Sequence, residues 1–396
     1  MTEISESLPA DGAAAPTASP TEVAAPHHDG FWGVIEDQFA LRQLISEYLI
    51  PKETNNFWYT LGGVLAIALV LEFVTGFLLS FAYSPDAGQA YDVTKMLIQT
   101  RVWSVVINFH FWNSFVIFAL VMIHMLRVFV TGAYRGSKIG LWLTGVGLAG
   151  ATFLISLTGE TLHWDEVGFA VPWHISEFFQ ATGLASALHY NFADLKDIPT
   201  ATQKLGQIYA THISLAAILL VLLVVLHYYL IKVKGISFPY WLKESGRTAP
   251  FSTHIKEWCI YGGIILGIVL LVAIFVPRDP GIAPQLLPSS PFYGETHGPG
   301  ALGTKPTYPI SWTHGMNVFV GEYLGIEPDI WGTVIGMALM TVALLAIPFI
   351  DRAKQAPRGW AEAFNLRQRG WAFLAMAVFW LVMIIGSATN FFEGAG

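Results

Sequence analysis

Seven long, mostly apolar runs constrain the fold of this 396-residue chain more than any other feature. An α-helix needs about 20 apolar residues to cross the hydrocarbon layer of a membrane. Only 12% of the residues are charged, and they gather between the runs, whereas about a quarter are charged in soluble proteins. The sequence therefore predicts an all-α integral membrane protein with about seven transmembrane helices. The predicted spans are residues 57–83, 104–130, 139–158, 208–232, 256–276, 330–350 and 370–391.

The first fifty residues contain no such run. Residues 1–30 are rich in Ala, Pro, Ser, Thr and Glu, so we expect a disordered tail and not a signal peptide. Residues 31–50 alternate aromatic and aliphatic residues with charges, which is typical of an amphipathic helix lying on the membrane surface.

The positive charges predict how the spans are oriented. The loops after the second, fourth and sixth spans, with their helix ends, hold 13 of the 21 Lys and Arg residues. Such residues are enriched on the cytoplasmic side of a membrane. We therefore expect a cytoplasmic N-terminus and a C-terminus on the outer side.

Four histidines lie inside two of the apolar runs. His110 and His124 are 14 residues apart, and His212 and His227 are 15 apart. Fourteen residues are close to four helical turns and span roughly 21 Å, so each pair shares a face at two depths. Histidine is scarce inside membranes and usually functional there, and imidazole is a ligand for iron. Two facing helices would thus hold two stacked haems. The alternative is that each histidine is only a buried polar residue with its hydrogen bonds satisfied, as a single histidine in an apolar helix often is.

Glycines repeat the same step on two other spans. Gly62 and Gly76 are 14 residues apart, and so are Gly145 and Gly159. A flat cofactor can pack against backbone where the side chain is missing, although small residues also serve ordinary helix packing. Arg127 follows the second histidine by three residues and is a candidate partner for a haem propionate or a positive-inside anchor.

The single cysteine, Cys259, excludes a disulfide within the chain, a CxxCH haem attachment and a cysteine-ligated iron–sulfur cluster. Any such centre must belong to another subunit. Nothing in the sequence indicates a nucleic-acid partner.

The chain resembles the cytochrome b of cytochrome bc and b6f complexes from about residue 31 onward, and most of all a cytochrome b6 joined to subunit IV. The 14 and 15 spacings of the histidines match the b6-like pattern. The stretches FVTGF around Gly76, HMLRVFVTGAYR from His124, TGETLHWDEVGF from Thr158 and PRDPGIAP from Pro277 are similar to those of the family.

This resemblance implies a four-helix dihaem bundle over residues 51–235 and a three-helix region over 236–396. It implies two non-covalent, bis-histidine b haems, with His110 and His212 on the outer haem and His124 and His227 on the inner one. The implied function is quinol oxidation in a bacterial-type cytoplasmic membrane, with electrons crossing to a second quinone site. The implied partners are a Rieske-type iron–sulfur subunit, a c-type cytochrome subunit or both, in a dimeric complex.

Several positions depart from the family pattern. The family's PEWY motif is absent, and the aligned residues are Pro309, Ile310, Ser311 and Trp312, of which Ser311 and Trp312 are candidate quinol-site residues. Thr60 stands where b6 has the cysteine of its covalent haem, so no covalent haem is expected.

Other groups would have to accept protons if the outer quinol site works. Glu160, His163, Asp165 and Glu166 cluster at the end of the third span, and carboxylates and histidines are suited to this task. They are candidates for a proton path or for contacts with another subunit. Glu72, a carboxylate inside the first span, is expected near the outer haem or this path.

Two other functions stay open. The chain could be a non-bifurcating dihaem anchor that passes electrons between the quinone pool and a peripheral oxidoreductase or multihaem cytochrome, which the missing PEWY favours. A transporter would explain the spans and Glu72 but not four histidines at haem spacing.

Overall fold

The computed structural model describes residues 48–184, 198–238, 240–241, 246–279, 281, 306, 309–355 and 357–392. The tail predicted for residues 1–30 lies outside them, as does most of the surface helix predicted for residues 31–50. The described end of that predicted helix is instead a strand. There β1 (Leu49–Pro51) pairs antiparallel with β2 (Thr248–Pro250).

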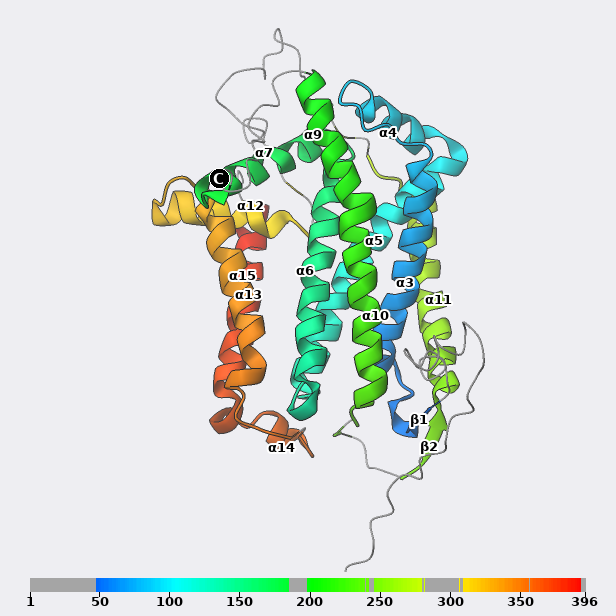
Figure 1. The fold of residues 1–396 in the computed structure, drawn as a ribbon, viewed down its shortest axis with the longest axis vertical. Helices are drawn as coiled ribbons and strands as arrows, with labels where there is room; N and C mark the ends of the chain where they lie inside the picture. Colours follow the sequence, from blue (N-terminus) through cyan, green and yellow to red (C-terminus); the bar gives the residue numbers. More distant parts are fainter. Residues whose placement is uncertain are drawn as a thin grey trace, which may run out of the picture. The chain divides into compact units, whose positions relative to one another are not determined.

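The part of the chain that carries the four histidines is a bundle of long helices with short helices at one end (Figure 1). Helix α3 packs on α5, and α6 packs on the π-helical segment η3 and on α10. Asn56 begins α3 by accepting a hydrogen bond from the amide of Trp58, which satisfies one of the free donors at a helix start. The elements are η1 (Lys52–Thr54), α3 (Phe57–Ser80), α4 (Ala90–Gln99), α5 (Arg101–Val130), η2 (Gly136–Lys138), α6 (Ile139–Thr161), α7 (Glu166–Ala181), α9 (Ile198–Ala210), η3 (Thr211–Ala216) and α10 (Ala217–Lys234).

The C-terminal helices flank this bundle on two sides (Figure 1). Helix α11 packs against α3 and α5, whereas α13 packs against α6 and, with α12, against α15. A cluster of apolar side chains from α5, α6, α12, α13 and α15 fills the second contact. The elements are α11 (Phe251–Phe275), α12 (Ser311–Val318), η5 (Phe319–Tyr323), α13 (Trp331–Ile350), α14 (Trp360–Ala363) and α15 (Leu366–Phe392).

Seven helical segments among the described residues are long and apolar enough to cross a membrane, and each contains most of a predicted span. The prediction of an all-α, multi-pass membrane protein is therefore confirmed. The main difference is the fourth segment, Ile198–Lys234, which begins ten residues before the predicted 208–232. The added residues belong to α9. This helix mixes polar and apolar residues, so a search for long apolar runs does not include it in the span.

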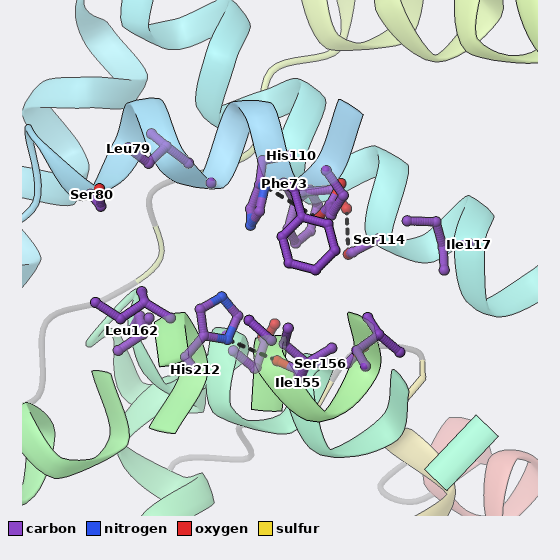
Figure 2. A pocket seen from close by; sticks show the side chains of 18 of the residues that line it. Phe73, Leu79, Ser80, His110, Ser114, Ile117, Ile155, Ser156, Leu162 and His212 are labelled. Atoms are coloured by element: carbon purple, nitrogen blue, oxygen red, sulfur yellow. Dashed lines mark hydrogen bonds and ion pairs between the residues drawn. The ribbon is translucent and has the colours of Figure 1, made fainter. Parts of the chain in front are cut away.

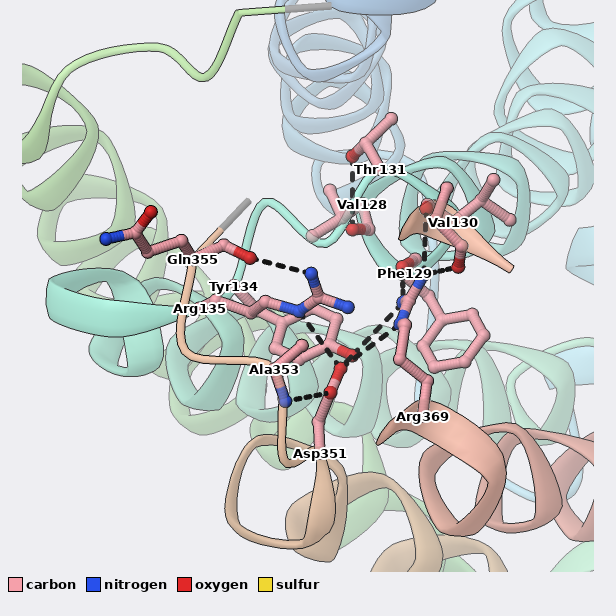
Figure 3. A network of polar contacts seen from close by, with 11 residues as sticks. Val128, Phe129, Val130, Thr131, Tyr134, Arg135, Asp351, Ala353, Gln355 and Arg369 are labelled. Atoms are coloured by element: carbon pink, nitrogen blue, oxygen red, sulfur yellow. Dashed lines mark hydrogen bonds and ion pairs between the residues drawn. The ribbon is translucent and has the colours of Figure 1, made fainter. Parts of the chain in front are cut away.

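A buried polar network joins the α5–α6 connection to α13 and α15 (Figure 3). The carboxylate of Asp351 accepts hydrogen bonds from the Tyr134 hydroxyl, from Arg135 Nε at 3.1 Å and from Arg369 Nε at 3.3 Å. Arg369 is fully buried and also donates to the carbonyl of Phe129 at 2.7 Å. Burial and the neighbouring carboxylate raise the pKa of Tyr134 to about 12, so its hydroxyl remains a donor. Because removing one partner of a buried ion pair costs about 3–5 kcal/mol, this network fixes α13 and α15 to the bundle.

Candidate functional site

A cavity of about 580 Å³ lies between α3, α5, α6 and the η3–α10 helix. Two of the predicted histidines, His110 of α5 and His212 of η3, face each other across it (Figure 2). Their ring centroids are 6.4 Å apart and the ring planes are inclined by 76°. The rest of the wall is mostly apolar, with side chains such as Phe73 and Ile155.

The separation of these two rings fits a metal atom bound to both. With metal–nitrogen bonds of about 2 Å to two opposed imidazoles, the ring centroids would be roughly 6 Å apart. The cavity around them is apolar and within the size range of small-molecule and cofactor sites.

All four predicted histidines lie over the four predicted glycines, which accommodate the imidazole rings directly. A methyl group added at Gly76 would lie 3.1 Å from Cε1 of His110, and one added at Gly159 would lie 2.9 Å from Cε1 of His212. The corresponding distances are 3.3 Å from Gly62 to His124 and 3.6 Å from Gly145 to His227. The histidines and the glycines thus share the 14-residue step because the same glycine–imidazole contact occurs four times.

Three of the four imidazoles are held by a threonine that directly precedes the glycine. The Nδ1 atoms of His110, His212 and His227 lie 3.0, 3.1 and 2.8 Å from threonine hydroxyl oxygens. Each hydroxyl donates to a carbonyl of its own helix and therefore accepts from the imidazole. The proton then lies on Nδ1, so Nε2 keeps a lone pair for a metal. These residues are Thr75, Thr158 and Thr144.

These threonines were not among the residues predicted from sequence, because threonine is common in membrane helices. The signal that would have found them is the Thr–Gly dipeptide, which occurs at three of the four glycines. The fourth glycine, Gly62, follows Leu61, and the Nδ1 atom of His124 has no hydrogen-bond partner within the described part of the chain.

A π-helical segment explains why one histidine pair is 15 residues apart and the other 14. Residues Thr211–Ala216, which include His212, form η3, and regular α-helix resumes from Ala217. A π-type turn holds one more residue than an α-helical turn and is frequent at functional sites. The extra residue is taken up there, so His212 and His227 still lie over glycines of the same helix, α6.

At the end of the bundle near His124, Arg127 lies over the ring of Tyr59, with its guanidinium carbon 4.7 Å from the ring centroid. Arg127 Nε and the Tyr59 hydroxyl are both buried, and neither has a hydrogen-bond partner among the described residues. Nearby on α11, His254 Nδ1 lies 3.0 Å from the side-chain oxygen of Asn55. Unpaired buried donors are costly, and an anionic group such as a propionate would satisfy them.

At the opposite end, near His110 and His212, Glu160, His163 and Asp165 come together with a residue that was not predicted from the sequence, Arg278. Arg278 Nη2 donates to Asp165 at 2.9 Å and lies 3.9 Å from Glu160, while His163 Nδ1 lies 3.8 Å from Glu160. Asp165 also begins α7 by accepting from the amide of Gly168. Burial, reinforced by the Arg278 charge, holds the pKa of His163 well below its usual range. Burial raises the pKa of Asp165, and the Arg278 charge offsets part of that rise.

The segment that aligns with the PEWY position also reaches the cavity. Pro309 and Ile310 lie in its wall together with Glu160 and His163. Ser311 begins α12, and Trp312 is buried in the apolar cluster, with its ring 5.8 Å from that of Phe153. The wall formed by this segment is therefore apolar.

The fold and the site define a class: an all-α, multi-pass membrane protein with opposed histidines enclosing an apolar cavity suited to a flat metal-containing group. The Cytochrome b/b6/petB family model matches residues 45–235. The match covers just under half of the chain, and together with the relatives below it supports a cytochrome b of the bc- and b6f-type electron-transfer complexes. Proteins of this family bind b-type haems.

Individual relatives agree with this assignment. The chain is 27% identical over 218 residues to the cytochrome b6 of Synechococcus elongatus, covering 54% of this chain and 98% of that protein. It is 26% identical over 222 residues to the cytochrome b6 of Prochlorococcus marinus, with the same coverage. A chain of a solved structure titled hyperthermophilic respiratory Complex III shares the fold with a TM-score of 0.62 and 18% identity, over 92% of this chain and 100% of that chain.

Proposed function

We propose that this chain is the dihaem cytochrome b subunit of a membrane complex that oxidises quinol. The observation that carries the proposal is the 6.4 Å separation of the His110 and His212 rings across the apolar cavity. The repeated glycine contacts extend the same arrangement to the second pair. We assign His110 and His212 to an outer b haem and His124 and His227 to an inner one, both bound without covalent attachment.

The surrounding residues have separate roles in this proposal. Gly62, Gly76, Gly145 and Gly159 leave space for the imidazole rings, and the threonines orient them. Arg127 and Tyr59 would hold a propionate of the inner group, since their buried polar atoms lack protein partners. A bound haem would supply one-electron transfer through its iron, so two haems would connect a quinol site at the outer end to a quinone site at the cytoplasmic end.

Quinol oxidation also requires a proton acceptor at the outer end. We assign Glu160 to this role because it lines the cavity beside His163 and because the low pKa of His163 makes its imidazole a weak base. Arg278 would hold Asp165 and the nearby carboxylate in place. Ser311 and Trp312, at the family's motif position, are candidates for shaping the same site.

The second candidate function keeps both haems but not the bifurcation of electrons. It is favoured by the apolar wall that Pro309 and Ile310 present, where the family places a carboxylate. The chain would then be a membrane anchor that equilibrates the quinone pool with a peripheral oxidoreductase or multihaem cytochrome.

The setting of the subunit follows from the same proposal. Its partners would be a Rieske-type iron–sulfur subunit, a c-type cytochrome subunit or both, in a dimeric complex. The excess of Lys and Arg in the loops after the second, fourth and sixth spans supports an N-terminus on the cytoplasmic side of a bacterial-type membrane and a C-terminus outside.

The test uses the complex purified with the full chain. We expect two b-type haems per chain in the dithionite-reduced spectrum, and rapid haem reduction by a short-chain quinol. The double variant Glu160→Gln/His163→Gln should reduce the quinol-dependent rate by about 10²-fold or more if proton acceptance limits it. The matched control is Glu177→Gln/His174→Gln, a partly exposed His–Glu pair with the same three-residue spacing.

Each outcome separates the candidates. Two haems, slow reduction of the Glu160/His163 variant and an unchanged control support quinol oxidation at the outer end. If the Glu160/His163 variant keeps two haems and an unchanged quinol-dependent rate, the second candidate function, the non-bifurcating membrane anchor, is favoured. A wild-type complex without haem overturns the proposed function.

A further inference from the structure

A second, polar pocket of about 530 Å³ lies where the connection between α13 and α15 meets the connection between α5 and α6. It shares no residue with the histidine cavity. Four side chains in its wall are cationic and one is a carboxylate. The cations are Arg135, Arg352, Lys354 and Arg358, and the carboxylate is Glu362. The wall therefore has the charge that attracts an anion.

One guanidinium nitrogen of Arg135 lacks a partner. Its Nε donates to Asp351 at 3.1 Å, and its Nη1 donates to the carbonyl of Gln355 at 2.7 Å (Figure 3). The third nitrogen, Nη2, is buried and has no hydrogen-bond partner among the described residues. Only 4% of the side chain is exposed. Because a buried donor without an acceptor is costly, an anionic oxygen in the pocket would stabilise Arg135.

The buried charges behind the pocket do not balance either. Asp351 pairs with both Arg135 and Arg369, at 3.1 and 3.3 Å. Within the described part of the chain, neither arginine pairs with another carboxylate. All three side chains are at most 4% exposed, and buried charges are normally paired. One positive charge is therefore left over, and an anion beside Arg135 would neutralise it.

The backbone holds the guanidinium of Arg135 in a fixed position. Gly132 adopts a φ of 61°, and a methyl group added there would lie 3.0 Å from Cζ of Arg135 and 3.0 Å from Cδ of Pro357. The guanidinium thus packs closely against Gly132, on the side where Pro357 also lies. A planar fork that is already oriented loses little freedom when it binds an anion.

The position of the pocket favours a phosphate group as that anion. One candidate span ends at Ile350 and the next begins at Leu366, so the wall lies at the level where a membrane has its headgroups. Trp360 and Leu366 are 59% and 67% exposed, and tryptophan is typical of membrane interfaces. Arginine binds phosphate oxygens in a bidentate manner, and basic pockets beside membrane helices suit anionic headgroups.

We propose that this pocket is a binding site for a phosphate group. Nη2 of Arg135 donates to a phosphate oxygen, and Arg352, Lys354 and Arg358 supply the surrounding positive charge. An anionic phospholipid and free inorganic phosphate both offer this chemistry. The place at the ends of two spans favours the lipid, whose chains would lie against the exposed apolar side chains. Because the two pockets share no residue, phosphate binding is independent of haem binding.

The test is a titration of the complex, purified with the full chain, followed by native mass spectrometry. The ligands are phosphatidylglycerol, phosphatidylcholine and inorganic phosphate. We expect saturable binding of one phosphatidylglycerol per chain. The variant Arg352→Gln/Lys354→Gln/Arg358→Gln should weaken it roughly 100-fold, because each cation near a membrane surface contributes about five-fold to the binding of an anionic lipid. Arg135 is left intact because it also holds Asp351.

The matched control removes three exposed cations from outside the pocket wall. It is Lys234→Gln/Lys256→Gln/Arg367→Gln, at the ends of α10, α11 and α15. This variant should keep the saturable lipid. Glu362→Gln is the opposite change, since it removes the carboxylate of the wall and keeps the cations. It should strengthen binding by about five-fold.

Each outcome decides the proposal. Phosphatidylglycerol that is lost from the pocket variant and kept by the control supports a lipid site. The same pattern with inorganic phosphate, and no preference between the two lipids, supports the site and assigns it to free phosphate. Equal binding by the wild type and the pocket variant, weaker binding by Glu362→Gln, or a wild type that binds none of the three ligands saturably would overturn it.

Discussion

The outer and inner histidine pairs are held between the same helices, but they are held differently. In the outer pair, the Nδ1 atoms of both His110 and His212 have hydrogen-bond partners in the protein. In the inner pair, His227 is bonded to Thr144, whereas His124 Nδ1 has no partner among the described residues. The two imidazoles of the outer pair are thus oriented by the polypeptide, and the inner pair lacks one of these constraints.

This difference follows from a single residue position. A threonine precedes three of the glycines, but Leu61 precedes Gly62, so no threonine hydroxyl is available to His124 Nδ1 there. Next to it lie the unpaired polar atoms of Arg127 and Tyr59. We infer that the protein preorganises the outer site, whereas the inner site completes its polar contacts only with its cofactor.

Replacing one of the proposed haem-ligating histidines should produce the largest effect and should show whether the two sites bind haem independently. His110→Ala and His227→Ala should each lower the haem content from two to one per chain, because neither pair shares a ligand with the other. The measurement is the pyridine haemochrome content of the purified complex relative to protein. Loss of both haems from either variant would contradict the independence of the two sites.

The next effect in size comes from filling the space between glycine and imidazole. In Gly159→Ala the new methyl group would lie 2.9 Å from Cε1 of His212, which is too close for carbon atoms, so the ring must move. Overpacking of this kind costs about 1–3 kcal/mol, more than the gain of up to about 1 kcal/mol from replacing a helical glycine. We expect a lower melting temperature and partial loss of the outer haem.

Gly145→Ala is the matched variant at the inner pair. Its methyl group would lie 3.6 Å from Cε1 of His227, an ordinary van der Waals contact. The helix-propensity gain then dominates, so the melting temperature should stay the same or rise slightly, with both haems retained. If the two alanine variants behaved alike, the glycine contacts would not distinguish the outer from the inner site.

The helices and the histidine pairing could be predicted from the sequence because both signals are local. Apolar runs report membrane helices whatever surrounds them, and the spacing of His110 and His124 within one helix needs no tertiary information. The 15-residue spacing of His212 and His227 was predicted to act as the same four-turn step, although a regular helix would turn the two rings about 60° apart. The π-helical segment that corrects this leaves no signal in hydropathy.

Contacts between distant parts of the chain could not be predicted. The Arg278–Asp165 pair joins residues 113 positions apart, and in the sequence Arg278 is indistinguishable from any loop cation. Likewise, Glu72 is unusual in the sequence because acidic residues are rare inside membrane spans. Only the packing of α3 on α5 shows that its neighbour is His110. The chemical type of each site residue is therefore readable from the sequence, whereas its partner depends on the fold.

The smallest expected effect comes from making the inner pair still less constrained. Thr144→Val removes the hydroxyl that accepts from His227 Nδ1 at 2.8 Å and keeps the shape of the side chain. A lost hydrogen bond of this kind is worth about 1 kcal/mol, and losing a partner of a metal ligand typically weakens metal binding about 10- to 100-fold. We expect Thr144→Val to lose the inner haem more readily than the wild type when the complex is titrated with a haem-binding apoprotein. The outer haem should be retained equally in both.

Thr152→Val, on the same helix, is the control for this change. Its hydroxyl donates to the carbonyl of Leu148, and no histidine lies among its hydrogen-bond partners in the described part of the chain. Both variants lose one threonine hydroxyl from α6, so a general loss of helix stability would affect both. Selective loss of the inner haem from Thr144→Val would mean that the single threonine bond to His227 compensates for the missing one at His124. Equal retention in both variants would instead mean that Arg127 and the cofactor's own contacts are sufficient to hold the inner group.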